Sequence, residues 1–262
     1  MNTSSIVQLT DPLPAAPLFT GWEETLIYSC LQGLMGCVWA DDPDHPSSAL
    51  ALLGDFGFVA GQPNPALACL AADRPFLILT PQNEDWSQLI EETFGDREHR
   101  RLRYAIKKEP GVFDREHLEK LAESLPPGYV LHRINRGLYK RCQKQDWSRD
   151  LTSQFPSYED FRRLGLGIVV TKGRALVAGA SSYARYLGGI EIEVDTREDH
   201  RRQGLASACC ARLILECLSK KLYPSWDAQN TVSVALAEKL GYHFDREYPV
   251  YEITAVGPET HS

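Results

Sequence analysis

The sequence runs IEIEVDTREDHRRQGLA from Ile190 to Ala206, and this stretch decides the fold of the C-terminal half. Its first six residues alternate isoleucine or valine with acidic side chains, which is the period of a β-strand. A polar loop follows, and Gly204 then opens a segment that predicts a long amphipathic helix over 203–221. A strand, a basic glycine turn and a helix in this order predict a backbone that curls around an anion.

The turn from Arg201 to Ala206 has the features of a phosphate cradle. A helix start leaves backbone N–H groups unpaired and carries the positive end of the helix dipole. Gly204 lets the backbone approach a phosphate, small Ala206 avoids crowding it, and Arg201 and Arg202 add positive charge. An ordinary strand-to-helix turn with solvated arginines has the same residues, so this segment alone leaves both interpretations open.

The surrounding pattern predicts a mixed α/β fold. Strands are expected over 129–134, 166–171, 175–182 and 190–194, and a helix over 230–240 ends before Gly241. Strands interleaved with helices in this way indicate an α+β mixed sheet with helices packed on it. The run Pro126-Pro127-Gly128 predicts a boundary between a smaller N-terminal αβ region, 1–126, and a C-terminal domain, 127–262. No internal repeat is apparent.

Composition excludes several classes of function. The net charge of -7 argues against nucleic acid, and the basic run over 97–103 is interpreted as a solvated strand face. The seven cysteines form no C-x-x-C pair, so neither a disulfide framework nor a metal site is expected. The first 17 residues contain no lysine or arginine, which disfavours a secretory signal, and no stretch has the length and apolar character of a membrane span. A cytoplasmic protein is expected.

Two motifs then resemble a known family. Arg201-x-x-Gly204-x-Ala206 matches the Q/R-x-x-G-x-G/A acetyl-CoA signature of the GNAT (GCN5-related N-acetyltransferase) superfamily, and 237–242 resembles the A-E-K-L-G-F/Y segment that follows it there. This similarity covers 129–254. The stretch from Tyr223 to Asn230 also resembles the P-x-W-D-A-x-N pattern of acetyltransferases related to zwittermicin A resistance, a likeness that extends over most of the chain.

The resemblance implies an acyl-CoA N-acyltransferase fold that moves an acetyl group from acetyl-CoA to a primary amine of a small molecule. Val194 and Thr196 would hydrogen-bond the pantetheine arm as if it were an added strand, and Asn230 and Ser233 would contact the cofactor near its thiol end. The pyrophosphate would be held by the segment that contains Arg201, Arg202, Gln203, Gly204, Leu205 and Ala206.

Proton transfer is assigned to two glutamates. Glu191 and Glu193 alternate with apolar residues and should share one face of the strand, where burial in a cleft would raise the pKa of a carboxyl toward that of a general base. An edge strand with its polar face in water is the alternative. The chain departs from the family at Ala237, where a tyrosine usually protonates the leaving thiol.

Two other functions stay open. One is a non-catalytic acyl-CoA-binding sensor, which the missing tyrosine motivates. The other is an adaptor whose N-terminal region binds a protein, and this predicts a large exposed apolar patch within 1–126. A homodimer is compatible with either, and the sequence does not identify the acceptor amine.

Overall fold

Two structural units divide the chain. In the computed structural model, which describes residues 6–72 and 74–254, one unit comprises Met1–Arg103 with Glu247–Ser262, and the other comprises Tyr104–Arg246. This division differs from the expected boundary at Pro127. The reason is that β6 (Glu98–Ile106) and β13 (Phe244–Thr254) each begin in one unit and end in the other.

The first unit is built on a mixed sheet with the strand order β1-β2-β3-β4-β5-β13-β6. Strands β2 to β4 form an antiparallel meander, whereas β4 and β5 are parallel and are joined by α2. The elements of this unit, besides β6 and β13, are β1 (Val7–Gln8), η1 (Leu13–Phe19), α1 (Thr25–Leu31), β2 (Cys37–Ala40), β3 (Ser48–Leu53), β4 (Phe56–Gly61), α2 (Pro65–Ala72), β5 (Phe76–Pro81), α3 (Glu84–Phe94) and η2 (Gly95–Arg97).

Apolar packing between α3 and the sheet forms the core of this unit. Trp86, Ile90 and Phe94 recur along one face of α3 and are buried, as the sequence pattern predicts. The indole Nε1 of Trp86 donates to the carbonyl of Gly61 at 2.9 Å, so burial leaves no unpaired donor on this ring. Tyr251 belongs to the same core although it lies near the C-terminus.

The second unit has a five-stranded sheet with the order β11-β10-β9-β8-β7. The hairpin of β8 and β9 turns at Gly173, whose φ of 58° is the left-handed conformation that the predicted turn requires. The elements of this unit are α4 (Arg115–Glu123), β7 (Tyr129–Arg133), α5 (Arg136–Cys142), η3 (Asp146–Leu151), α6 (Tyr158–Leu164), β8 (Gly167–Lys172), β9 (Ala175–Tyr186), β10 (Gly189–Thr196), η4 (Glu198–His200), α7 (Leu205–Ser219), β11 (Tyr223–Ser225), β12 (Asp227–Ala228) and α8 (Thr231–Lys239).

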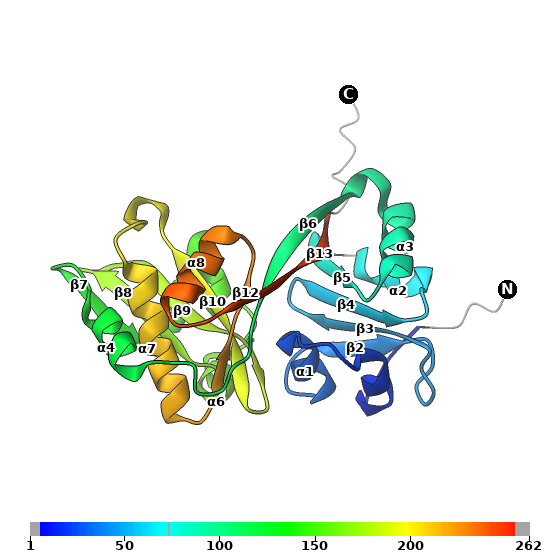
Figure 1. Cartoon of the computed structure of the whole chain (residues 1–262), viewed down its shortest axis with the longest axis horizontal. Coiled ribbons are helices and arrows are strands. Elements are labelled where there is room, and N and C mark those ends of the chain that lie inside the picture. Colours follow the sequence, from blue (N-terminus) through cyan, green and yellow to red (C-terminus); the bar gives the residue numbers. More distant parts are fainter. Residues whose placement is uncertain (1–5, 73, 255–262) are drawn as a thin grey trace. The chain divides into compact units, whose positions relative to one another are not determined.

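Helix α7 covers one face of this sheet, and α4 lies beside it (Figure 1). Cys210 and Cys217 lie seven positions apart on α7, and both are completely buried. Burial raises the pKa of the Cys217 thiol to about 12, so this side chain behaves as a small hydrophobe rather than as a nucleophile. These features confirm a mixed α/β fold.

The two units repeat one topology that the sequence does not reveal. In each, an antiparallel meander of three strands leads into a helix and then into a strand parallel to the last strand of the meander. Helix α2 makes this crossover in the first unit, and α7 makes it in the second. Among the described residues, no helix has the length and apolar character that crossing a membrane requires.

The last strand should contribute strongly to stability. Ile253 pairs with Leu77 of β5 and is only 2% exposed, although chain ends generally tolerate substitution. Ile253→Ala should lower the free energy of unfolding by about 2–4 kcal/mol because it leaves a cavity in the core. Leu187→Ala, at a site that is 68% exposed, should change it by less than about 0.5 kcal/mol in the same urea titration. Equal effects would contradict a structural role for β13.

Candidate active site

Strands β10 and β11 separate after only three residue pairs. The last pair is Glu191 with Ser225, after which the chain turns away and Asp227–Ala228 pair with β6 instead. Within the described residues, 192–196 of β10 therefore pair with β9 alone. A strand in this position has one open edge, which presents backbone groups to an added strand or a ligand.

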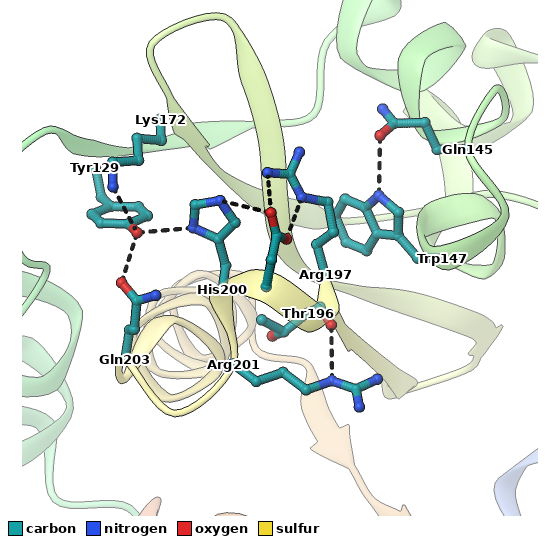
Figure 2. A network of polar contacts seen from close by, with 10 residues as sticks. Tyr129, Gln145, Trp147, Lys172, Thr196, Arg197, His200, Arg201 and Gln203 are labelled. Carbon is teal, nitrogen blue, oxygen red and sulfur yellow. Dashed lines mark hydrogen bonds and ion pairs between the residues drawn. The ribbon is translucent and has the colours of Figure 1, made fainter.

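The backbone groups of β10 point alternately toward β9 and toward the open edge. Arg197 N donates to the Val177 carbonyl at 2.9 Å, so the alternate residues Asp195 and Glu193 also direct their backbone groups toward β9. The backbone groups of Val194 and Thr196 consequently point to the open edge. At Thr196 they contact side chains. Its N–H donates to Asp195 Oδ1 at 3.1 Å. Its carbonyl accepts from Arg201 Nε at 3.3 Å, as Figure 2 shows.

The loop after β10 carries two left-handed residues. Arg202 has a φ of 62° and Gly204 has a φ of 78°. Apart from its two neighbours in the chain, no described residue has an atom within 4 Å of the position that a Cβ on Gly204 would occupy, so the backbone there faces open space. Successive N–H groups around a left-handed residue form the concave nest that binds anions.

Helix α7 starts without a side-chain cap, because its N-cap is Gly204. The first N–H groups of a helix need partners, and an Asn, Asp or Ser side chain supplies one at the starts of α3, α4, α5, α6 and α8. The start of α7 thus lacks the side-chain cap of these five helices, a feature that it shares with α1, whose N-cap Glu24 makes no such hydrogen bond. The crossover helix of the first unit shows the contrast: Asn64 Oδ1 accepts from Ala66 N at 3.0 Å, and Pro65 has no N–H to offer.

Polar contacts connect the loop to β7 and β8. Tyr129 Oη contacts His200 Nδ1 at 2.8 Å, Gln203 Oε1 at 2.6 Å and Lys172 Nζ at 3.3 Å (Figure 2). His200 is 9% exposed and packs edge-on against the Tyr129 ring. Arg197 forms a bidentate ion pair with Asp199 at 2.6 and 3.0 Å.

Glu191 and Glu193 lie on β10, the strand that separates from β11 after Glu191. Ile190 and Ile192 pack into the core that includes α7, so the alternating glutamates take the other face of β10. The register between β9 and β10 shifts here, but it skips Tyr183 of β9 and leaves the alternation along β10 intact. Glu191, at the last residue pair before the strands separate, is 8% exposed, and Glu193 is partly exposed.

Asp195 is a titratable group that the sequence pattern did not single out. It pairs with Gly179, where an added Cβ would lie 2.5 Å from Leu151 Cδ1, so Asp195 is on the face of the sheet that η3 covers. Burial raises its pKa to about 6, and the negative charge of Asp150 adds to the rise. The Thr196 N–H and the charge of Arg201 oppose it.

Trp226, which directly follows β11, contacts the first turn of α8. Its Nε1 donates to Ser233 Oγ at 3.1 Å, and Asn230 Oδ1 accepts from Ser233 N at 2.9 Å as the N-cap of α8. Asn230 and Ser233 therefore meet at the start of α8. Ala237 is fully buried in that helix. The nearby Tyr242 hydroxyl donates to the Pro224 carbonyl at 2.6 Å, and burial raises its pKa well above the ordinary value.

A parallel crossover with an open strand edge and an uncapped helix start presents backbone donors to an anionic ligand. A family model of the GNAT acetyltransferases matches residues 16–251, so the chain belongs to this family of acyltransferases. The match spans both structural units, whereas the signature motif alone lies in the second.

Similar proteins agree with this assignment. A GCN5-related N-acetyltransferase-like protein from Streptococcus suis is 50% identical, with a TM-score of 0.89 over 93% of this chain and 98% of that one. The uncharacterised N-acetyltransferase YdfB of Bacillus subtilis is 28% identical over 87% of this chain and 89% of its own length. A tandem GNAT protein from the clavulanic acid pathway, 12% identical with a TM-score of 0.53 over 97% and 99% of the two chains, shares the fold.

Several site residues escape sequence reasoning because the fold alone brings them together. Tyr129 and Lys172 lie 71 and 28 positions before His200 and belong to no motif of the loop. Ser225 is notable only because it marks the end of the pairing between β10 and β11. Asp195 stands inside the quoted stretch, where its alternation with Val194 and Thr196 was the one available signal.

The raised pKa of Asp195 predicts a pH-dependent effect on stability. Since this pKa is about 6 in the folded chain against an ordinary 3.8, folding favours the protonated carboxyl. The associated stability is complete below the ordinary pKa and is lost as pH rises through the folded pKa. Asp195→Asn, which stays neutral, should therefore raise the melting temperature near pH 8 and change it least near pH 4.

Thermal unfolding across this pH range is the measurement, with Asp96→Asn as the control because Asp96 is exposed and lies in the other unit. A pH-independent gain in Asp195→Asn would show that the carboxyl is not destabilised by its surroundings.

Proposed function

We propose that this chain transfers an acetyl group from acetyl-CoA to a primary amine of a small molecule. The observation that carries the proposal is the left-handed, uncapped start of α7 at Gly204, next to the open edge of β10. Acetyl-CoA is the acyl donor typical of the family to which the chain belongs. When bound, it supplies an activated acetyl thioester.

The loop residues fit the pyrophosphate. Backbone N–H groups from Arg202 to Ala206 would donate to its oxygens, because the helix start has no side-chain cap and Gly204 leaves space for a close approach. Arg201 and Arg202 are exposed and would add charge. The side chain of Gln203 is bonded to Tyr129, so its part in binding would be limited to the backbone.

The open edge fits the pantetheine arm. Its amides would pair with the backbone groups of Val194 and Thr196, in place of the Asp195 and Arg201 side chains that contact Thr196. Thr196 Oγ1 is buried and has no hydrogen-bond partner among the described residues, which leaves one more polar group for a ligand at this edge. The Asn230 amide and Ser233 at the start of α8 would lie toward the thiol end.

Glu191 and Glu193 are the proposed general bases. The neutral amine nitrogen forms a bond to the acetyl carbon, the carbon–sulfur bond breaks, and the nitrogen loses one proton to the carboxylate. Glu191 is the better placed of the two, because it is buried at the last residue pair before β10 and β11 separate. The sulfur leaves as a thiolate, a weak enough base that the absence of a tyrosine at Ala237 does not prevent transfer.

The acceptor is proposed to be a small amine. The likeness of 223–230 to acetyltransferases related to zwittermicin A resistance supports this part of the proposal. An adaptor is less well supported, because large exposed hydrophobic residues among the described part of 1–126 are limited to Leu13, Phe76 and Leu102. One alternative stays open because Ala237 stands where the family usually has a tyrosine: a sensor that binds acyl-CoA without turnover. Assays with a panel of amines would distinguish this sensor from an enzyme. The cytoplasmic location and the homodimer stay predictions.

Calorimetric titration with acetyl-CoA tests the cradle. Gly204→Glu should weaken binding by about 100-fold or more, because the new carboxylate would stand in the anion site and its Cβ would strain a left-handed residue. Gly188→Glu is the matched control: its φ is 93°, it too has no atom within 4 Å of an added Cβ, and it lies in the turn between β9 and β10. Equal binding by both variants would place the cofactor elsewhere.

Substitution of the glutamates tests the chemistry. Glu191→Gln or Glu193→Gln should reduce kcat by about 100-fold or more through loss of the base, while the Kd for acetyl-CoA stays near that of the wild type. Amines from the panel that the wild type acetylates provide the assay. Full turnover in both variants would remove the glutamates from the mechanism but leave the cofactor site in place.

A further inference from the structure

The Tyr129 hydroxyl makes three polar contacts in the second unit. It comes from β7, at the far edge of the sheet from β11, yet it reaches two residues of the loop before α7 and one residue of β8. Lys172 Nζ also lies 4.8 Å from the centroid of the Tyr129 ring. Tyr129 is 8% exposed and its contact with His200 is buried, whereas Lys172 and Gln203 reach it from exposed positions.

The chemistry of these side chains determines which atoms of the cluster donate and which accept. A phenol has one proton, and Gln203 Oε1 at 2.6 Å can only accept it. His200 Nδ1 at 2.8 Å must then donate its own proton to Tyr129 Oη, and Lys172 Nζ donates as well. The hydroxyl thus donates once and accepts twice, which fills its hydrogen-bonding capacity.

The two loop partners of Tyr129 bracket a strained residue. His200 precedes Arg202 by two positions and Gln203 follows it directly. Arg202 has a Cβ and a φ of 62°, a conformation that costs free energy outside glycine and persists only where the surroundings enforce it. In the structure, the Arg202 backbone lies between two residues, His200 and Gln203, that are both hydrogen-bonded to Tyr129 Oη.

We propose that Tyr129 is a positioning residue for the anion cradle: its hydroxyl holds His200 and Gln203 so that Arg202 keeps the left-handed conformation that shapes the loop. The inference rests on the proposed function in so far as the cradle binds acetyl-CoA. Tyr129 itself does not contact the cofactor. It acts through the loop, and Lys172 holds the tyrosine from the opposite side.

Tyr129→Phe removes the hydroxyl and keeps the ring packed against His200. It should weaken CoA binding by about tenfold in calorimetry, because the loop must then pay the cost of ordering on binding. Tyr139→Phe controls for the loss of a buried hydroxyl, since Tyr139 Oη donates to the Phe155 carbonyl at 2.6 Å on α5, away from the loop. The control should bind CoA like the wild type.

Rescue by glycine separates positioning from a general loss of stability. In Tyr129→Phe/Arg202→Gly the strain is gone, so CoA affinity should return to within about threefold of Arg202→Gly alone. Arg202→Ala removes the same guanidinium but keeps a Cβ, and adding it to Tyr129→Phe should give no rescue. If glycine and alanine behave alike, or if Tyr129→Phe binds CoA as tightly as the wild type, the proposal is overturned.

Amide hydrogen exchange over 197–206, measured without CoA, tests whether Tyr129 positions the loop independently of the cofactor. Tyr129→Phe should exchange faster there and Tyr139→Phe should not. Should the wild type bind no CoA, the proposed function fails, while faster exchange in Tyr129→Phe still supports a positioning role for Tyr129. Unchanged exchange in that variant would overturn the positioning role even if CoA binds.

Discussion

The separation of β10 from β11 is the constraint on which the site depends. A strand with an open edge must find partners for its backbone groups, and at Thr196 these are the side chains of Asp195 and Arg201. The same separation places Glu191 at the end of the paired region, where it is buried next to the edge. The open edge and the placement of the carboxylate therefore follow from one departure of the chain after Ser225.

The repeated topology shows which local changes make a crossover helix a candidate anion site. Both α2 and α7 follow the last strand of a meander, but α2 begins with Asn64 and Pro65, which satisfy or remove its first donors. Helix α7 begins with Gly204, which does neither. The first unit thus retains the architecture while its equivalent helix start is closed, so the family's cofactor motif and the open helix start coincide in the second unit alone.

Local signals were enough to predict much of this arrangement. The alternation over 190–196 and the glycine at 204 specify a strand, a turn and a helix within one short segment, and the structure has all three. The sequence could not predict that β6 and β13 each begin in one unit and end in the other, because β-pairing between residues far apart in sequence leaves no local pattern. The contacts of Tyr129 with the loop were missed for the same reason, and the roles assigned to individual site residues remain predictions.

Charge within the loop is arranged so that one of its two acidic residues is neutralised. Asp199 stands next to the cradle, but Arg197 binds it through two hydrogen bonds and lowers the pKa of its carboxyl. In the rest of the loop, the charges of Arg201 and Arg202 and the helix dipole outweigh the single negative charge of Glu198. The acidic chain as a whole, at -7, is therefore compatible with a local anion site, because the field at a helix start depends on its nearest charges and not on the net charge.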